Sequence, residues 1–330
     1  MDIIFEQLKE TGIIKLNRPK ALNALNYDMS EKFSYQLDEW EKNEDIKRVL
    51  LVGEGKHFCA GGDVKSLSLK GKSSELRKNF FLSEYKLNYK ISNFKKPYLS
   101  LWNGVVMGGG VGLSLYGNYR IVTDTTKFAM PETSIGFFPD VGASYFLPRI
   151  KNNFGIYLAL TGHVINSNEI LKLGLGTHYC PYNQTENFID QYVMKGNIKQ
   201  FKIQPNNSSG ELYNNSLIYE CFQGDIKNIF KKLQSSNMEL FNILNKKCPM
   251  SLAATSFLLE KGRNKSLKQC LEMEFKLSQN MVYREDFDEG IDAVLISKHN
   301  KPNWNPSTII DINLKEVDKL FESNQDSLKL

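Results

Sequence analysis

Several features that mark common protein classes are scarce or missing in this 330-residue sequence. No window approaches the roughly 18 consecutive apolar residues of a membrane span. The five cysteines are widely spaced, without a CxxC pair, and only four histidines are present. A disulfide framework and a zinc site are therefore not expected, and a reducing compartment fits best. The glycine runs match neither the GxGxxG dinucleotide fingerprint nor the GK[ST] ending of a P-loop.

Charge and targeting signals are also weak. The formal net charge of +5 would suit a polyanionic ligand such as a nucleotide-bearing cofactor, but it is too small to indicate nucleic acid. Apolar residues at 41% and charged residues at 24% describe a globular chain. The N-terminal segment contains neither a secretory apolar core nor an acid-poor, Arg/Ser-rich transit segment, although an earlier one could have been removed.

Short apolar stretches alternate with glycine-rich turns in the first half of the chain. The pattern at residues 2–16 predicts two short strands with a turn at Thr11–Gly12. Further strands are predicted at residues 48–55, 97–106 and 118–130. Because strand, glycine turn and helix recur, we expect stacked β–β–α units in a layered α/β fold.

Helical patterns fill much of the rest. A helix is predicted at residues 28–42, with Asp28 or Ser30 as its cap. Its buried face is expected to carry Phe33, Leu37 and Trp40. Further helical segments are predicted at residues 75–92, 155–180 and 225–295.

Composition suggests where the chain divides. Residues 182–217 are rich in Asn, Gln and Ser and are predicted to be an exposed connection, and the last twenty residues are polar. We expect a core of residues 1–200 that holds the site and a mainly helical region of residues 201–330.

Two glycine-rich loops each follow a predicted strand and lead into a predicted helix. They are KHFCAGGDV at residues 56–64 and NGVVMGGGVGL at residues 103–113. Glycines let main-chain N–H groups approach a ligand closely, so two such loops could stabilise one developing oxyanion. The alternative, that both are tight turns that pack helices onto strands, remains open.

Two acids lie in the apolar stretch FAMPETSIGFFPDVGASYFLPR, residues 128–149. Glu132 could begin a helix, and a turn is expected at Pro139–Asp140. Burial among aromatic residues would raise the pKa of either carboxyl group and make it usable in acid, base or nucleophilic chemistry. The alternative is that each acid only caps a helix or stabilises a turn.

Taken together, these motifs resemble the crotonase (enoyl-CoA hydratase/isomerase) superfamily, and within it the 3-hydroxyisobutyryl-CoA hydrolase branch. The resemblance also covers LNRPKALNALN at residues 16–26, ALTGHVINSNEILKLGLGTHY at residues 159–179, and EMEFKLSQNM in the last third. It implies a crotonase-like spiral of β–β–α units with a C-terminal helical region that binds an acyl-CoA thioester.

The family's two oxyanion N–H groups map by resemblance onto Gly62 and Gly109. In hydratases a catalytic glutamate closes the glycine-rich run, and here that position is Gly112. This departure argues against hydration, which uses two opposed carboxylates around one water.

The resemblance assigns catalysis to Glu132 and Asp140, and substrate binding to these two acids with Gly109 and Glu84. Glu132 would attack the thioester carbonyl or position water, and Asp140 would orient water and manage protons. Glu84 would touch the substrate hydroxyl, and its alternative is a solvated helical glutamate. Which acid plays which part is left open.

The coenzyme A arm is expected along the segments LNRPKALNAL and AGGDVKSL. The binding residues would be Lys20, Ala21, Asp63 and Lys65. Both lysines could equally be plain surface residues. His57 is expected to shape its loop, and Cys59 to be a small buried residue beside it rather than a nucleophile. His178 is expected to pack at the start of a strand, and no Ser–His–Asp triad can be inferred.

The implied reaction is hydrolysis of a short hydroxyacyl-CoA, most specifically 3-hydroxyisobutyryl-CoA, in valine breakdown, and it needs no metal or redox cofactor. The partner is the small-molecule substrate, without membrane or nucleic acid, and homo-oligomerisation is left open. One rival is hydratase or isomerase activity. Another is a non-catalytic component of a mitochondrial ribosome. The resemblance implies a mitochondrial location, with the cytoplasm as the alternative.

Overall fold

The computed structural model describes residues 1–196, 198, 215–322 and 328–330. The chain forms two compact units that interleave in sequence. The first unit contains residues 1–62, 86–129 and 164–210, and the second contains residues 63–85, 130–163 and 211–330. The boundary expected at residue 200 adjoins residues 199–214, which lie outside the described part of the chain.

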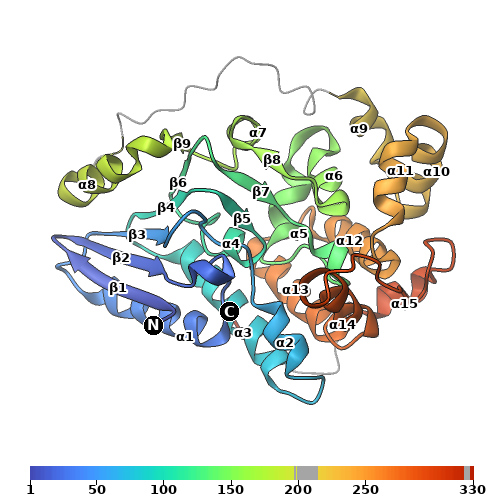
Figure 1. The fold of residues 1–330 in the computed structure, drawn as a ribbon, viewed down its shortest axis with the longest axis horizontal. Coiled ribbons are helices and arrows are strands. Elements are labelled where there is room, and N and C mark those ends of the chain that lie inside the picture. Colours follow the sequence, from blue (N-terminus) through green and yellow to red (C-terminus); the bar gives the residue numbers. More distant parts are fainter. Residues whose placement is uncertain (197, 199–214, 323–327) are drawn as a thin grey trace. The chain divides into compact units, whose positions relative to one another are not determined.

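The first unit is built on a six-stranded sheet with the order β1-β2-β3-β4-β6-β9 (Figure 1). Its strands are β1 (Ile3–Leu8), β2 (Thr11–Leu16), β3 (Arg48–Gly53), β4 (Tyr98–Trp102), β6 (Tyr119–Val122) and β9 (His178–Tyr179). Only β1 runs antiparallel to its neighbour, whereas every other neighbouring pair is parallel. A second sheet has the order β5-β7-β8, formed by Val105–Met107, Lys127–Ala129 and Ile165–Asn166.

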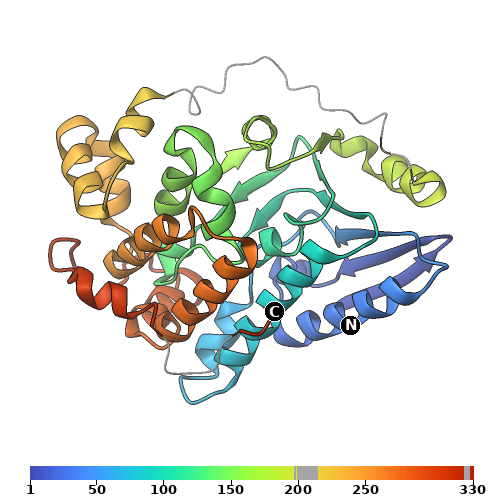
Figure 2. The same cartoon turned by 180° about the vertical axis from the view of Figure 1, so that it is seen from behind.

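Helices pack on the six-stranded sheet. α1 (Tyr27–Lys42) buries the predicted Phe33, Leu37 and Trp40, and the Trp40 ring meets Phe5 of β1 edge-on at 6.1 Å. Figure 2 shows this helix running beside β1 and β2. α8 (Thr185–Lys195) contributes Phe188, Tyr192 and Val193 to a core with Leu50, Leu99 and Ile121 of the sheet. The unit also contains the short helices α4 (Gly109–Gly112) and α7 (Ser167–Lys172), the 3-10 turns η1 (Pro19–Ala21) and η5 (Tyr182–Gln184), and the second part of α3 (Leu76–Asn93).

The second unit is mainly helical. It contains α2 (Val64–Leu69), the first part of α3 (Leu76–Asn93), the 3-10 turns η2 (Glu132–Ile135), η3 (Leu147–Arg149) and η4 (Lys151–Asn153), and the π-helix η6 (Asp292–Ile296). Its other helices are α5 (Ala143–Phe146), α6 (Phe154–Thr161), α9 (Ser216–Cys221), α10 (Ile226–Ser236), α11 (Met238–Asn245), α12 (Pro249–Gly262), α13 (Leu267–Met281), α14 (Glu285–Ile291) and α15 (Leu314–Lys319).

Most predicted elements are present, but several details were wrong. The β1–β2 turn lies at Lys9–Glu10 rather than Thr11–Gly12. Gly12 is inside β2, where a Cβ would come within 2.6 Å of the Trp40 ring, so its small size serves packing and not the turn. The cap of α1 is Asn26, whose side chain accepts a hydrogen bond from the Met29 N–H, rather than Asp28 or Ser30.

Two predicted strands are each split between the two sheets. Residues 97–106 break after Trp102 into β4 and β5, and residues 118–130 break at a Thr123–Thr126 turn into β6 and β7. Both breaks fall at residues that commonly form turns, Asn103–Gly104 and Thr123–Thr126, which the two strand predictions had included. In the second case the Thr126 hydroxyl donates to the Trp102 carbonyl at 2.5 Å, which ties the turn to the end of β4.

The predicted connection at residues 182–217 was wrong where α8 and α9 form, and its residues 199–214 lie outside the described chain. The helical prediction for residues 155–180 is interrupted by β8 and β9, whereas the one for residues 225–295 holds as α10 to α14 and the π-helix η6. In the polar last twenty residues α15 forms, and residues 323–327 are not described.

Gly136 ends η2 with a left-handed backbone, φ +71°, and a Cβ there would lie 2.0 Å from the Asp286 carbonyl oxygen. We expect Gly136→Ala to lower the free energy of unfolding by at least about 3 kcal/mol, because backbone strain adds to overpacking. Urea unfolding measures this change.

Gly174→Ala is the matched control, since Gly174 has φ +72° but nothing within 4 Å of the added Cβ. Only the backbone strain of about 1 kcal/mol should appear there. Equal losses in the two variants would contradict the close contact between η2 and α14.

Candidate active site

Residues 56–62 and 103–113, which carry the glycines of the two loops, lie together in the first unit and are joined by main-chain hydrogen bonds. The Cys59 N–H donates to the Val105 carbonyl at 3.0 Å, and the Met107 N–H donates to the Cys59 carbonyl at 3.0 Å. A Cβ built on Gly61 would lie 3.7 Å from the amide nitrogen of Gly109. The structure therefore brings the Gly61–Gly62 stretch beside the loop that carries Gly109, as an oxyanion site made of two loops requires.

Side chains behind the first loop hold its main chain. Asn23 is buried, and its amide group donates to the carbonyls of Glu54 and His57 at 3.0 and 2.7 Å. His57 Nδ1 accepts from the Val105 N–H at 3.3 Å, which links the two loops as expected of a histidine that shapes them. Cys59 is fully buried, as predicted.

Three carboxylic acids gather in the second unit. Glu84 comes from α3, Glu132 begins η2, and Asp140 follows Pro139 in the loop before α5. Their exposed fractions are 2%, 7% and 5%. Among the described residues none of the three forms an ion pair, and one oxygen each of Glu84 and Glu132 has no hydrogen-bond partner. Such buried acids are unusual unless they meet a ligand.

Aromatic rings form the apolar surroundings of these acids. Phe137 stacks on Phe81 and Phe138 with ring centroids 5.1 and 4.4 Å apart. Tyr85 packs against Phe81 at 6.0 Å and meets Phe275 of α13 edge-on at 6.4 Å. These rings keep water away from the carboxyl groups, so their charged forms are poorly solvated.

Burial raises the pKa of all three carboxyl groups, and repulsion by neighbouring carboxylates adds to the rise for Glu84 and Glu132. For Glu84, desolvation dominates, followed by the charges of Asp140 and Glu132, and the pKa lies well above its ordinary value. Desolvation and the Asp140 charge also raise the pKa of Glu132 well above normal. Desolvation raises the pKa of Asp140 to about 7, although the Tyr85 hydroxyl, which donates to its Oδ2 at 2.7 Å, opposes the shift. Asp140 thus titrates in the range that acid–base catalysis uses.

The backbone near these acids agrees only in part with the sequence predictions. Glu132 does begin a helical turn, η2. The turn after Phe138 is centred on Val141–Gly142 rather than Pro139–Asp140, since the Ala143 N–H donates to the Asp140 carbonyl at 2.9 Å. The alternative for Glu84, a solvated helical glutamate, is wrong because the side chain is buried.

Sequence reasoning missed two residues of this region, Tyr85 and Glu274. Glu274 of α13 is fully buried and accepts hydrogen bonds from the Gly142 N–H at 2.6 Å and the Ser144 N–H at 2.9 Å. Burial raises the pKa of Glu274 to about 8, while the bonds from Ser144 and Gly142 oppose the rise. Its spacing from the buried Cys270, Leu277, Ser278 and Met281 places it on the apolar face of α13, and this signal was readable in the sequence.

The residues predicted for coenzyme A lie at or near the surface. Lys20 and Ala21 are exposed in η1, and Lys65 is exposed in α2. Asp63 also has a structural part, because its side chain caps α2 by accepting from the Ser66 N–H at 3.2 Å. Their part in binding stays a prediction. His178 does start β9, as expected.

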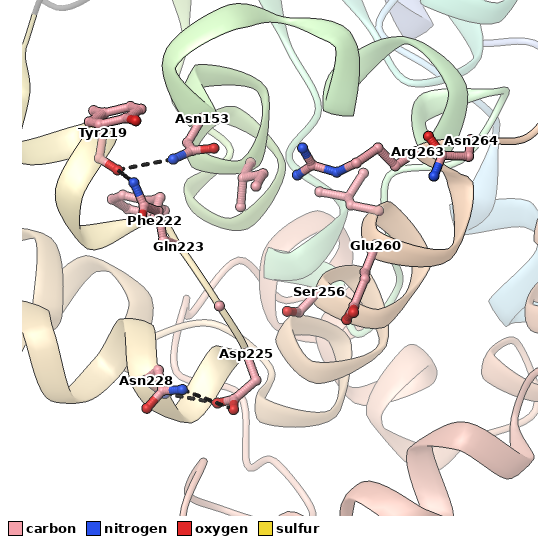
Figure 3. A pocket seen from close by; sticks show the side chains of 13 residues that line it. Asn153, Tyr219, Phe222, Gln223, Asp225, Asn228, Ser256, Glu260, Arg263 and Asn264 are labelled. Atoms are coloured by element: carbon pink, nitrogen blue, oxygen red, sulfur yellow. Dashed lines mark hydrogen bonds between the residues drawn. The ribbon is translucent and has the colours of Figure 1, made fainter.

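Metal-ligand clusters, membrane-spanning helices and cavities would indicate other kinds of site in the described part of the chain. Within it, no cluster of three His, Cys, Asp or Glu side chains is suited to hold a metal ion. Among the same residues, no helix is long and apolar enough to cross a membrane. A cavity of about 980 Å³ opens between α6, α9 and α12, but its walls include none of the predicted catalytic residues (Figure 3).

The chain belongs to the enoyl-CoA hydratase/isomerase family, which matches residues 11–321. Along its whole length it is similar to proteins named "3-hydroxyisobutyryl-CoA hydrolase, mitochondrial". The relative from Danio rerio is 37% identical, with 100% of this chain and 92% of the relative covered. The one from Homo sapiens is 35% identical, with 98% and 89% covered.

Two solved structures match with a TM-score of 0.94. A carnitinyl-CoA dehydratase from Mycobacterium thermoresistibile is 32% identical over 99% of this chain and 98% of that one. An enoyl-CoA hydratase from Rhodobacter sphaeroides 2.4.1 is 29% identical, and all of both chains is covered. The predicted crotonase-like fold and the resemblance to the hydrolase branch are confirmed.

Glu84→Gln should stabilise the protein at high pH. Because the folded-state pKa of Glu84 exceeds 4.5, its ordinary value, the wild type loses stability as pH rises through that folded pKa. Gln removes the buried charge, so the free energy of unfolding should exceed the wild-type value by roughly 1–3 kcal/mol at pH 8 and differ little near pH 4.5. Urea unfolding at the two pH values checks this.

Glu75→Gln, an exposed change just before the same helix, serves as the control and should show no such pH dependence. A Glu84→Gln variant that is less stable than wild type at pH 8 would show that Glu84 is ionised and well paired in the fold.

Proposed function

We propose that this protein hydrolyses 3-hydroxyisobutyryl-CoA to 3-hydroxyisobutyrate and coenzyme A. The buried cluster of Glu84, Glu132 and Asp140 is the observation that carries the proposal. Thioester hydrolysis needs a nucleophile or base and a group that manages protons near neutral pH, and these acids meet both needs. The names of the relatives that are 33–38% identical support the same substrate.

In the proposed reaction the main-chain N–H groups of Gly62 and Gly109 stabilise the negative charge that develops on the thioester oxygen. Water adds its oxygen to the carbonyl carbon, and the carbon–sulfur bond breaks. The coenzyme A thiol leaves with a proton, and the acyl group departs as the carboxylic acid. Because coenzyme A is part of the substrate, this chemistry requires no separate cofactor.

Glu132 can act in either of two ways. As a nucleophile it would form a mixed anhydride with the acyl group, which water then hydrolyses with release of free Glu132. As a general base it would take the proton from the attacking water. Asp140 orients the water and transfers protons in both routes, and its pKa of about 7 suits both accepting and donating.

Glu84 would bind the substrate hydroxyl group. Its Oε1 is buried without a hydrogen-bond partner among the described residues, so a hydroxyl donor from the substrate would satisfy it. A site built to hydrogen-bond a hydroxyl group discriminates strongly against an acyl chain that lacks one. Lys20, Ala21, Asp63 and Lys65 would bind the coenzyme A arm.

Hydration of an enoyl-CoA is the second candidate, because the two solved structures with a TM-score of 0.94 are titled as a dehydratase and a hydratase. The absence of a carboxylate at Gly112, which is buried inside α4, disfavours it. We further propose a mitochondrial location, since the names of the relatives include this compartment.

Glu132→Gln and Asp140→Asn should each fold and lose most turnover, with kcat lower by about 10²–10⁴-fold, because each removes a group that handles protons or the acyl carbon. A thiol reagent that reports coenzyme A, with 3-hydroxyisobutyryl-CoA and crotonyl-CoA as parallel substrates, measures this. Wild-type protein should release thiol from the first substrate. Consumption of crotonyl-CoA alone, without thiol release, would overturn the hydrolase proposal in favour of hydration.

Two acids outside the cluster provide matched controls. Glu169 is buried in the capping box of α7, where Gln can replace Glu, and Asp225 caps α10, where Asn caps equally well. Glu169→Gln and Asp225→Asn should retain activity. Wild-type rates in Glu132→Gln and Asp140→Asn would remove both acids from catalysis.

Tyr85→Phe should move the pH dependence of hydrolysis upward. The Tyr85 hydrogen bond holds down the pKa of Asp140, which is about 7, so its loss raises that pKa. If ionised Asp140 is the active form, the rising limb of kcat shifts to higher pH by up to about one unit. A pH–rate profile tests this.

Tyr98→Phe removes another buried phenol, one that donates to the Leu113 carbonyl at 2.8 Å, and should leave the profile unchanged. If the profile of Tyr85→Phe matches the wild type, Asp140 does not set the rising limb.

A further inference from the structure

The turn that follows Asp140 adopts a costly backbone. Val141 has φ +52° and Gly142 has φ +87°, so two consecutive residues are left-handed. This conformation suits glycine but is rare for a β-branched residue such as valine. A strained segment persists only when its surroundings enforce it, and such segments cluster at functional sites.

Glu274 of α13 forms hydrogen bonds to this turn and to the first residues of α5. Its Oε2 accepts from the Gly142 N–H at 2.6 Å, and its Oε1 accepts from the Ser144 N–H at 2.9 Å and the Ser144 hydroxyl at 2.5 Å. Gly142 is the N-cap of α5 and has no side chain to cap that helix. A carboxyl group 130 residues away in sequence therefore supplies the cap.

The same helix also supports the Asp140 side chain. Phe275, the next residue of α13, packs edge-on against the Tyr85 ring, and the Tyr85 hydroxyl donates to Asp140 Oδ2. The backbone after Asp140 and the carboxyl group of Asp140 are thus held from two adjacent positions of α13. Figure 1 shows α5 beside α13.

We propose that Glu274 is a positioning residue for Asp140: by capping α5 and enforcing the left-handed turn, it sets the orientation of the Asp140 carboxyl group. The inference rests on the proposed hydrolase function, in which Asp140 orients water. Small displacements of a catalytic group cost rate far more than they cost substrate binding. Loss of Glu274 should therefore appear in kcat rather than in KM.

Glu274→Gln is the first test, with 3-hydroxyisobutyryl-CoA as substrate. The amide keeps the size of the side chain but turns an NH₂ group toward one of the donors. We expect kcat to fall roughly 10–100-fold while KM changes less than about threefold. Ser144→Ala, which removes one of the three hydrogen bonds, should lower kcat by about three- to tenfold. Unchanged kcat in both variants would overturn the proposal.

Glu272→Gln is the matched control, because it makes the same substitution on the same helix two residues earlier, where the side chain is only partly buried. It should leave kcat and KM unchanged. A loss equal to that of Glu274→Gln would indicate a general effect of altering α13 and would overturn the positioning role.

A double-mutant cycle separates positioning of the turn from a general structural role. Val141→Gly relieves the left-handed strain, so the turn no longer depends on Glu274 to the same degree. In that background, Glu274→Gln should lower kcat by less than about threefold. An equal loss with Val141 and with glycine at position 141 would show that Glu274 does not act through the turn.

Hydrogen exchange gives a readout that is independent of activity. In Glu274→Gln the amides of Gly142 and Ser144 should exchange at least about tenfold faster, whereas Glu272→Gln should match wild type. If wild-type protein releases no coenzyme A but exchange behaves as expected, the hydrolase proposal fails, while the conclusion that Glu274 holds the turn stands. If wild-type protein is active and exchange is unchanged in Glu274→Gln, Glu274 does not hold the turn, while the hydrolase proposal stands.

Discussion

The site of the second unit is governed by the burial of three carboxyl groups that, among the described residues, have no cationic partner. Glu84, Glu132 and Asp140 are buried in a region rich in stacked aromatic side chains. A charge buried there loses most of its hydration. The pKa of each group rises, and simultaneous ionisation of all three is disfavoured. Such a cluster weakens the fold near neutral pH. A chain retains it where the protons themselves are needed, which is the usual relation between stability and activity at catalytic sites.

The backbone that follows Asp140 is held by a residue far away in the sequence, Glu274. The turn after Asp140 is left-handed at Val141, and α5 begins at a glycine that cannot cap it. Glu274 meets both demands at once through bonds to Gly142 and Ser144. One further buried acid thus serves the geometry of the turn, whereas Tyr85 serves the ionisation of Asp140. Orientation and pKa are controlled by different neighbours of the same residue.

The first unit instead holds main-chain N–H groups of two loops in fixed positions. Two loops from neighbouring parallel strands are tied by hydrogen bonds between Cys59 and residues 105 and 107. Buried Asn23 and half-buried His57 hold the carbonyls and amides behind them. Glycine matters at position 110, because a Cβ there would lie only 2.5 Å from the Cys59 carbonyl oxygen of the other loop. Rigid donors of this kind need no reorganisation when charge develops on a bound carbonyl.

The sequence alone was enough to predict the family, the strand–glycine–helix repeats and the burial of Glu132 and Asp140, because ordered motifs and apolar neighbours are local information. It also contained the buried face of α13, where Glu274 stood among apolar residues at helical spacing. Three-dimensional contacts were needed to show that Gly12 accommodates Trp40, that residues 97–106 and 118–130 divide between two sheets, and that Glu274 caps α5. These features depend on contacts between residues far apart in the chain, and neither propensity nor periodicity reports such contacts.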